Sequence, residues 1–488
     1  MIGRVPYCAA LLLSWAAREA AADPFLQFEL LGGHVEIPIL AAVRGEGVSS
    51  FPVDAEGHPF QSGLAASPVL RLGLRLTLPD AFAEHVGVFA EYEQDLPTGT
   101  WSGDAPIAGE GLPNSRALET QLRKAWGRFS LGYFHVGGGL MTSHWGLGLV
   151  ANDGAHGWEP GSARFLDPRN GDLVLRGFLA TGPLTDAKLM VSLSIDKVRQ
   201  DDALIEGDDA FQLSGSVLVG HDRPTQAGLL FVHRRQTAAD GRFLHASLID
   251  LTGRAVTELG DAKLTLEAEA VITLGDTDLG ASPELPVRDL LQLGAALRAA
   301  VAFTQFGGVL DVVYASGEPD TYDVRATGFH ADSNFETGLL LFRYVQAAHT
   351  GRGHGTAADP QLVGAPPAGI ERWPTRGGLT NTLLFFPRLW VRPLADLEAY
   401  GGVLVALAPE TNIDPFNTNV GGGTLRNALD QSPGGYWGTE VDVGLRYQLD
   451  LDPARVSLGA EGGVLFPGSA LGDTSAIYGG RVLIGVQL

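Results

Sequence analysis

The stretch "YWGTEVDVGLRYQLD", Tyr436 to Asp450, alternates between two kinds of side chain. Every second residue from Trp437 is apolar or aromatic, apart from one threonine, and the residues between are glycine, polar or charged. A period of two is that of a β-strand, whose successive side chains point to opposite faces. The stretch therefore predicts a long strand with an apolar environment on one side and a polar one on the other.

The same alternation recurs along the chain, for example in Val69–Leu78, Ala187–Asp196, Ala262–Gly275 and Ala454–Phe466. These runs exceed the five or six residues of a typical soluble strand and match the roughly 9–11 of a tilted strand that crosses a membrane. Lipid accepts a sheet only when the sheet closes, because an open edge leaves unpaired N–H and C=O groups in hydrocarbon. The sequence therefore predicts an all-β fold, a transmembrane antiparallel β-barrel with lipid outside.

The barrel is predicted to have eighteen strands, within a range of sixteen to eighteen. The linkers alternate between short turns and long loops, as in barrels with short periplasmic turns and long outer loops. This alternation requires that Gly338–Ala348 does not span, so we assign it to a large outer loop, 317–379, as a helix or a strand extension packed in the lumen. The predicted strands are 26–40, 68–78, 84–95, 115–126, 129–138, 172–181, 187–197, 209–220, 225–236, 242–252, 262–275, 290–303, 307–316, 380–392, 396–408, 437–449, 454–466 and 477–488.

Aromatic residues near the ends of the runs are typical of the girdles that such barrels place at the membrane interfaces. They are Trp126, Phe129, Trp437, Tyr447, Phe466 and Tyr478. Soluble sandwiches and propellers also alternate, but their strands are shorter. A propeller also shows a blade repeat of about 40–50 residues, which this sequence lacks.

The first 22 residues read as a secretory signal peptide. Arg4 provides a basic start, Val5–Ala17 an apolar segment and Ala20–Ala22 a small-residue cleavage site. A buried N-terminal helix is the alternative. Residues 23–488 then form a single barrel domain, and it contains no cysteine, because the one cysteine of the chain lies in the signal. Disulfides and thiolate chemistry are thereby excluded.

Charge and hydropathy exclude further classes of function. The chain carries a formal net charge of −22. Removing a signal of net charge +1 gives −22 − 1 = −23, which argues against a nucleic-acid partner. After residue 22 there is no apolar run long enough for a transmembrane helix. Neither a phosphate-binding loop nor a zinc-helix motif is present, so the sequence predicts no cofactor, no metal and no enzymatic activity.

An eighteen-stranded barrel encloses a lumen too wide for its own wall side chains to fill. Charged residues on the polar faces are predicted to line it, although many of them can pair with one another. Because their signs are mixed, ion selectivity stays open. Arg71 and Arg75 beside Glu440, Asp442 and Arg446 are the favoured constriction. The pore-lining candidates are Arg71, Arg75, Arg123, Arg176, Glu267, Glu269, Arg388, Glu440, Asp442 and Arg446.

Two loops carry weaker signals. Loop 317–379 is the favoured inward constriction, and its "GRGHG" is a weak metal motif, more often solvated. The acidic stretch Arg199–Ala210, "RQDDALIEGDDA", offers carboxylates for Ca²⁺ or for ion bridges to lipopolysaccharide, against an ordinary solvated loop. Outer-membrane lipid and lipopolysaccharide are the expected partners of the barrel surface.

Two phrases, "VVYASGEPDTYD" (Val312–Asp323) and "GFHADSNFETGLLLF" (Gly328–Phe342), resemble a late segment of the alginate-export family of outer-membrane porins. In that family a strand ends in a similar Tyr-Ala-Ser/Thr-Gly stretch and enters a long outer loop. The strand count is similar too, whereas Leu488 stands where an aromatic residue is usual. The resemblance implies passive transport of a hydrophilic solute, without carrying over alginate itself.

The sequence therefore favours an outer-membrane channel of a Gram-negative bacterium for passive diffusion or export of a hydrophilic solute. One alternative is a plugged structural or adhesive barrel. Another is an outer-membrane hydrolase, for which Ser143, His144 and His245 are the candidate residues. The solute and the oligomeric state stay open.

Overall fold

The fold is that of a computed structural model, and the predicted signal peptide lies outside its described residues. No helix among the described residues is long and apolar enough to cross a membrane. The described residues are 26–60, 64–81, 85–98, 101–102, 119–166, 171–280, 282, 287–335, 337–351, 362 and 366–488.

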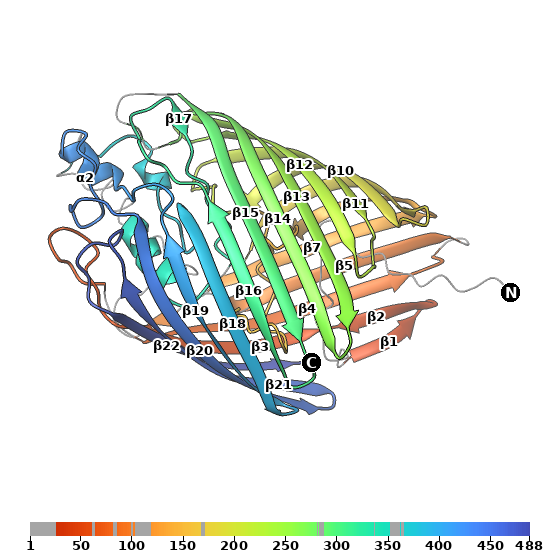
Figure 1. The fold of residues 1–488 in the computed structure, drawn as a ribbon. Coiled ribbons are helices and arrows are strands. Elements are labelled where there is room, and N and C mark those ends of the chain that lie inside the picture. The colour runs from red at the N-terminus through yellow and green to blue at the C-terminus, as the bar shows by residue number, and fades with distance from the viewer. Residues whose placement is uncertain are drawn as a thin grey trace.

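Eighteen antiparallel strands form one closed ring (Figure 1). Each pairs with the strands before and after it in the ring, and β22 closes it against β3. The predicted all-β barrel and the preferred count of eighteen are confirmed. The ring consists of β3 (Ile39–Val48), β4 (Leu64–Leu78), β5 (Val86–Thr98), β7 (Glu119–Leu131), β8 (Phe134–Thr142), β9 (Leu173–Leu184), β10 (Leu189–Gln200), β11 (Asp209–Val219), β12 (Gln226–Thr237), β13 (Phe243–Leu259), β14 (Ala262–Thr277), β15 (Arg288–Ala302), β16 (Phe306–Ala315), β18 (Thr382–Leu394), β19 (Leu397–Leu407), β20 (Tyr436–Leu451), β21 (Ala454–Pro467) and β22 (Ile477–Gln487).

The first ring strand lies later in the sequence than predicted. β1 (Leu26–Leu30) and β2 (Gly33–Ile37) form a hairpin beside β4, so the strand predicted at 26–40 is wrong. Pro38 separates this hairpin from β3, because proline has no N–H to give to a sheet ladder. The carbonyl of Pro38 instead accepts a hydrogen bond from Gly73 N (2.8 Å). A Cβ on Gly73 would lie 2.6 Å from the proline ring, so glycine is needed there.

Short turns and long connections alternate around the ring, as predicted. The turns 132–133, 185–188, 260–261 and 452–453 lie at the end that holds the C-terminus. The long connections and the short helix α2 (Pro415–Val420) lie at the other end (Figure 1). The turn at 132–133 was predicted too early, at 127–128, and the strand before the turn at 260–261 was predicted to end at 252, seven residues before its observed end, because glycines inside strands resemble turn signals. The other short strands are β6 (Trp101–Ser102), paired with β4, and β17 (Arg325–Ala326), parallel to β15.

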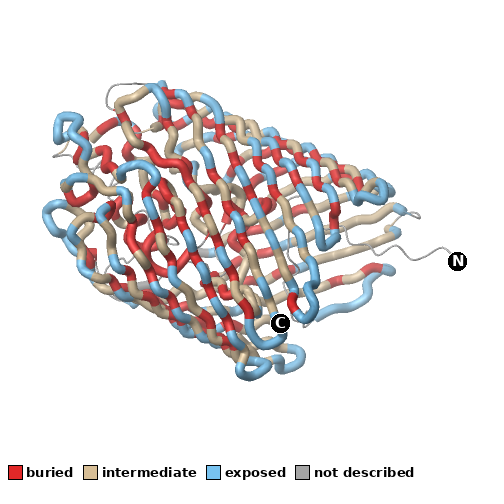
Figure 2. The backbone as a smooth tube through the Cα atoms, in the orientation of Figure 1, coloured by how far each residue is buried: buried red, intermediate tan, exposed pale blue. Residues whose placement is uncertain are grey.

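Buried and exposed residues alternate along the strands (Figure 2). In β10, Leu193 and Ile195 are 60% and 62% exposed, whereas Ser192 and Ser194 are buried. Large apolar side chains exposed in rows are unfavourable in water and favourable in hydrocarbon. Phe129, Phe466 and Tyr478 lie on this outer face, as expected of girdle residues. Trp126 and Trp437 do not, because both are buried, so their assignment to the girdles was wrong.

The polar face of the sheet points into the ring. A hydrophobic core also lies inside the ring. Its members come from strands and from long connections, and they include Leu149, Phe165, Leu340, Phe342 and Leu404. Connections that fold into the ring therefore bury a protein-like core between themselves and the wall. Gly338–Ala348 belongs to this filling: it contains the π-helix η1 (Leu341–Gln346) and pairs with no strand.

Candidate functional site

The charged residues predicted to line a pore occupy the inward-facing side of the ring strands. Two of the ten, Arg75 and Glu267, are partly exposed. The other eight are buried, because neighbouring side chains and infolded connections cover them, and whether they line a pore stays a prediction. The buried eight are Arg71, Arg123, Arg176, Glu269, Arg388, Glu440, Asp442 and Arg446.

Several wall charges pair across adjacent strands. Arg176 lies opposite Asp196 in the ladder and contacts both carboxylate oxygens, at 2.6 and 2.7 Å. Arg71 lies opposite Asp95 and contacts it in the same way, at 2.7 and 3.0 Å. Two-point contacts between guanidinium and carboxylate are the strongest and most directional ion pairs in proteins. These charges therefore hold the wall together.

The charge cluster predicted for the constriction does not form. Arg71 and Arg75 of β4 pair with β5, the latter through Glu91 (3.0 Å). Arg446 of β20 pairs instead with Glu461 of β21 (2.7 Å). Because the ring closes between β22 and β3, strands β21, β22 and β3 separate β20 from β4. The prediction failed because it assumed neighbouring positions across this seam.

The connection between β8 and β9 folds into the ring and is tied to the wall. We call residues 143–166 the β8–β9 segment. Near its end, Arg388 Nη1 donates to the carbonyl of Ala163 (3.2 Å) and Arg481 Nη2 to that of Phe165 (2.6 Å). The segment is therefore held from two sides of the barrel, by β18 and by β22.

The start of the β8–β9 segment is held by a carboxylate. Glu269 of β14 accepts hydrogen bonds from the backbone N–H groups of Leu147 and Leu149. Arg123 of β7 donates to the carbonyl of Asp153 (2.8 Å). Backbone polar groups buried away from water need such partners, so charged wall residues are what allows this chain segment to lie inside the ring.

Asp311 of β16 is the single carboxylate between two arginines. It contacts Arg298 at 2.8 and 3.0 Å and Arg388 at 2.6 Å. Arg164 of the β8–β9 segment lies nearby: burial, reinforced by the charges of Arg298 and Arg388, lowers its pKa to about 9. Its guanidinium makes no hydrogen bond or ion pair among the described residues. Three arginines therefore gather around Asp311, and the negative charge of Glu267 also acts on Arg164.

A second inward segment, residues 337–351, is anchored in a related way. Glu440 of β20 accepts hydrogen bonds from the three consecutive N–H groups of residues 339–341, at 2.6, 2.8 and 2.7 Å. These groups precede and begin η1, and the first N–H groups of a helix have no partner within it. A carboxylate there satisfies them and also faces the positive end of the helix dipole. Glu440 is thus placed as an anchor of the segment.

Two further interactions complete the anchoring of residues 337–351. Arg343 of η1 pairs with Glu46 of β3 (3.1 Å), which Arg44 also contacts (3.0 Å). The apolar side of the helix, with Leu341 and Val345 fully buried, joins the same core as the β8–β9 segment. The two inward segments therefore pack as one body against the wall.

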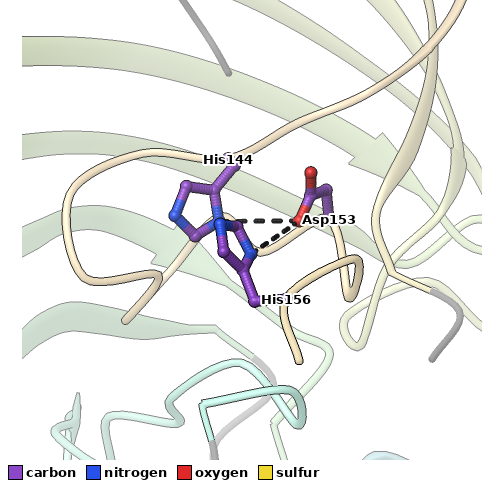
Figure 3. Close-up of side chains that lie close together, drawn as sticks. All are labelled: His144, Asp153 and His156. Carbon is purple, nitrogen blue, oxygen red and sulfur yellow. Dashed lines mark ion pairs between the residues drawn. The ribbon is translucent and has the colours of Figure 1, made fainter. Parts of the chain in front are cut away.

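Within the β8–β9 segment, His144, Asp153 and His156 come together (Figure 3). One oxygen of Asp153 lies 3.1 Å from Nδ1 of His156 and 3.8 Å from Nδ1 of His144. Burial lowers the pKa of His144 to about 4, despite the opposing charge of Asp153. Reading the sequence for motifs did not bring these three residues together, since they lie at positions 144, 153 and 156.

The residues proposed for a hydrolase have other partners. Ser143 Oγ accepts a hydrogen bond from Arg176 (3.1 Å). His144 faces Asp153, and His245 of β13 lies beside Asp276 (3.5 Å) with about half its side chain exposed. Among the described residues, no hydrogen bond joins a histidine to Ser143, so the nucleophile–base pair that hydrolysis needs is not assembled.

The acidic loop 201–208 is folded against its neighbours. Asp208 accepts two hydrogen bonds from Arg372, at 2.7 and 2.8 Å. Asp202 accepts hydrogen bonds from the N–H (2.7 Å) and the hydroxyl (3.1 Å) of Ser333. Asp201 pairs with Arg234. These carboxylates are thus used to join connections at the outer end of the barrel.

Three buried aspartates in these connections repel neighbouring aspartates when they are charged. Burial raises the pKa of Asp332, Asp172 and Asp202, and the negative charges of neighbouring aspartates raise them further. A pKa raised in the folded state means that stability is greatest below the ordinary carboxyl pKa and falls as pH rises through the raised value. The connections are therefore expected to loosen as pH increases above about 4.

Replacing Asp332 by asparagine is expected to raise the urea midpoint of the detergent-solubilised protein at pH 8 and to change it little at pH 4. At pH 8 the substitution removes a negative charge buried among other aspartates, whereas at pH 4 the raised pKa keeps the carboxyl protonated and little is gained. Asp240→Asn is the control, because hydrogen bonds from Arg242 lower the pKa of Asp240 and its loss is expected to act in the opposite direction. An equal effect of Asp332→Asn at both pH values would contradict this account.

No protein-family model and no curated protein matches the sequence. Several solved structures share its architecture. A BenF-like porin from Pseudomonas fluorescens Pf-5 has a TM-score of 0.54 and 11% identity, covering 93% of this chain and 98% of that one. Pseudomonas aeruginosa OccK2 (OpdF), solved with glucuronate, has a TM-score of 0.52, 11% identity and the same coverage. Pseudomonas aeruginosa OpdK, solved with vanillate, has a TM-score of 0.50, 13% identity and the same coverage.

These comparisons define the class of protein: an eighteen-stranded barrel with the architecture of outer-membrane porins. They also correct the resemblance drawn from sequence. The structures that match are OccK-type and BenF-like porins, and the resemblance to the alginate-export family is wrong. The phrase that suggested it, Val312–Asp323, is the end of β16 and the connection after it. A strand followed by a long loop is common to large barrels, so the phrase has little power to separate families.

Proposed function

We propose that this protein is a passive channel in the outer membrane of a Gram-negative bacterium, for a small hydrophilic solute. The observation that carries the proposal is the contrast between the two faces of one closed ring. The outer face is apolar and exposed, whereas the inner face carries charged residues and the infolded connections. A sheet with this polarity is stable only with lipid outside and a polar interior.

The two inward segments form the constriction of this channel. They are fixed by charged wall residues at several points, and wide barrels narrow their lumen with such infolded chain. Five of the ten predicted lining residues contact these segments directly through hydrogen bonds, which supports their assignment to the constriction: Arg123, Arg176, Glu269, Arg388 and Glu440. Outer-membrane lipid and lipopolysaccharide contact the outer face, and the protein has no catalytic role, since Ser143 is bonded by Arg176 and no hydrogen bond joins it to a histidine among the described residues.

The solute carries a carboxylate, and Arg164 contacts it. This guanidinium belongs to the β8–β9 segment and lies near Arg298 and Arg388, which pair with Asp311. Arginine binds a carboxylate through two parallel hydrogen bonds and so selects for that group. Among proteins with the same fold, OccK2 was solved with glucuronate and OpdK with vanillate, both carboxylates.

Planar-bilayer recordings of the refolded protein test both the channel function and the contact between Arg164 and the solute. We expect steady conductance, and a block of the current by glucuronate whose half-maximal concentration rises about 10-fold in Arg164→Gln, since one charge-assisted contact of about 1.5 kcal/mol is lost. Arg235→Gln is the control, because Arg235 is exposed on β12 and the same charge is removed. Insertion without conductance would contradict the channel. Conductance with equal block in both variants would contradict only the role of Arg164.

A further inference from the structure

The cluster of His144, Asp153 and His156 has the geometry of a metal site. The three candidate ligand atoms lie within 4.8 Å of one another. Ligands placed about 2.1 Å from a zinc ion are about 3.0–3.5 Å apart at angles between 90° and 109°. The two measured nitrogen–oxygen distances, 3.1 and 3.8 Å, lie close to this range. To surround one ion, the His144–Asp153 distance would have to shorten by a few tenths of an ångström, and the two histidine nitrogens, which lie within 4.8 Å of each other, would have to approach to about 3.5 Å.

His144 provides a second, independent observation. Its side chain is only 8% exposed, and its Nδ1 atom has no hydrogen-bond partner among the described residues. The Oδ1 atom of Asp153 is 3.8 Å away, which is too distant for a hydrogen bond. A buried polar atom without a partner costs free energy, so such atoms are rare and call for an explanation. A metal ion between this nitrogen and the Asp153 oxygen would satisfy both.

The backbone already holds the ligands in place. Ala155 N donates to Asp153 Oδ1 (3.1 Å), and Arg123 fixes the carbonyl of the same residue. The two imidazole rings are 4.2 Å apart, centre to centre, at an angle of 37°. Ligands positioned by the surrounding structure lose little freedom on binding a metal, which favours affinity.

Two imidazoles and one carboxylate are a donor set typical of zinc and of neighbouring divalent transition metals, and not of Ca²⁺ or Mg²⁺, which prefer oxygen ligands alone. Three protein ligands leave a fourth position for water. The His156 side chain keeps 20% of its surface exposed, so an ion has access from that side.

We propose that His144, Asp153 and His156 bind one divalent transition metal of the zinc class and that this ion fixes the β8–β9 segment. The ion would join the start of the segment, beside the end of β8, to residues nine and twelve positions later (153 − 144 = 9; 156 − 144 = 12). The segment would then be held by three kinds of tie: the metal, Glu269 near its start, and the arginines near its end. This goes beyond the channel function, because it assigns a ligand that is not transported.

Zinc binding to the refolded full-length protein tests the proposal. After dialysis against excess zinc and then metal-free buffer, we expect one zinc per chain by elemental analysis, and less than a tenth of that in His144→Ala and in His156→Ala. His58→Ala is the matched control, because His58 belongs to an exposed group with Asp54 and Glu56 and is expected to leave the zinc content unchanged. The heat-modifiable shift of folded barrels on gels, together with conductance, shows that each variant has folded.

Substitution with Co²⁺ provides a spectroscopic measurement. If His144 and His156 had only a structural role, replacing them would not change the Co²⁺ spectrum. Replacing zinc by Co²⁺ is expected to give visible absorption bands of a site with nitrogen and oxygen ligands, and both histidine substitutions are expected to abolish them while the His58→Ala variant retains them. Folded wild-type protein that retains no zinc would overturn the proposal. So would zinc and cobalt signals that persist in the folded His144→Ala variant, since the ion would then bind elsewhere.

Discussion

Asp311→Ala is expected to lower the free energy of unfolding by about 3–5 kcal/mol, the largest stability effect of any single substitution considered for this barrel. Asp311 is 3% exposed and is the shared partner of Arg298 and Arg388. Removing it leaves two buried guanidinium groups without their anion, and each would have to be neutralised, solvated or moved. Urea-induced unfolding in detergent micelles, followed by tryptophan fluorescence, measures the change.

The control for this substitution is Asp450→Ala. Asp450 also lies opposite an arginine in the ladder, Arg455, at 2.7 Å, but it is 71% exposed at the end of β20. Exposed ion pairs of this kind contribute about 0–1 kcal/mol. The two variants thus compare the same chemistry at nearly the same distance with and without burial. Similar losses in both would show that the buried pair around Asp311 is not the origin of the effect.

Glu440→Ala is expected to release residues 339–341 from the wall. Three buried N–H groups lose their acceptor, and leaving such donors unsatisfied costs about 2 kcal/mol or more. Amide hydrogen exchange at these residues should therefore become at least ~30-fold faster. Because the segment belongs to the proposed constriction, open-channel current should also become noisier. Exchange measured by mass spectrometry and bilayer recording provide the two readouts.

Glu398→Ala is the matched control for the release of residues 339–341. Glu398 is equally buried and also accepts a hydrogen bond from an infolded backbone group, that of Gly161 (2.7 Å), in the β8–β9 segment. Its loss is expected to speed exchange around Gly161 and to leave residues 339–341 protected. If Glu440→Ala left the exchange of those amides unchanged, apolar packing of Leu341 and its neighbours would be sufficient to hold the helix.

The strands were largely predictable, because one face of each strand contacts lipid and the other faces the interior. This contrast gives the sequence of each strand a period of two. Tyr436–Leu451, for example, contains the whole of the alternating stretch at 436–450. Alternation does not show where a ring begins, and this is why 26–40 was taken for the first strand. β3 was missed because its outward face has two glycines and one alanine, and its inward face has apolar residues beside Arg44 and Glu46, so the contrast between its faces is weak.

The arrangement of the interior was less accessible from sequence. Inward charges could be recognised on each strand, but their partners depend on register, which a shift of one residue changes completely. The pairing of Arg298 of β15 with Asp311 of β16, for instance, needs the ladder that places the two residues opposite each other. The inward segments were harder still, since Glu269 and Leu147 are joined across 122 positions of sequence. No feature of the neighbouring sequence indicates that a carboxylate will accept a hydrogen bond from a distant backbone N–H group.

The closing pair of strands has a consequence for biogenesis. The last residue, Leu488, exchanges two backbone hydrogen bonds (2.9 Å each) with Ile39, at the start of the first ring strand. Nearly the whole chain must therefore be delivered before the sheet has no edges. Contacts so distant in sequence form slowly, and until then two strand edges are open to pairing with other chains. The barrel consequently depends on periplasmic holding factors and on assembly that shields both edges until the final strand arrives.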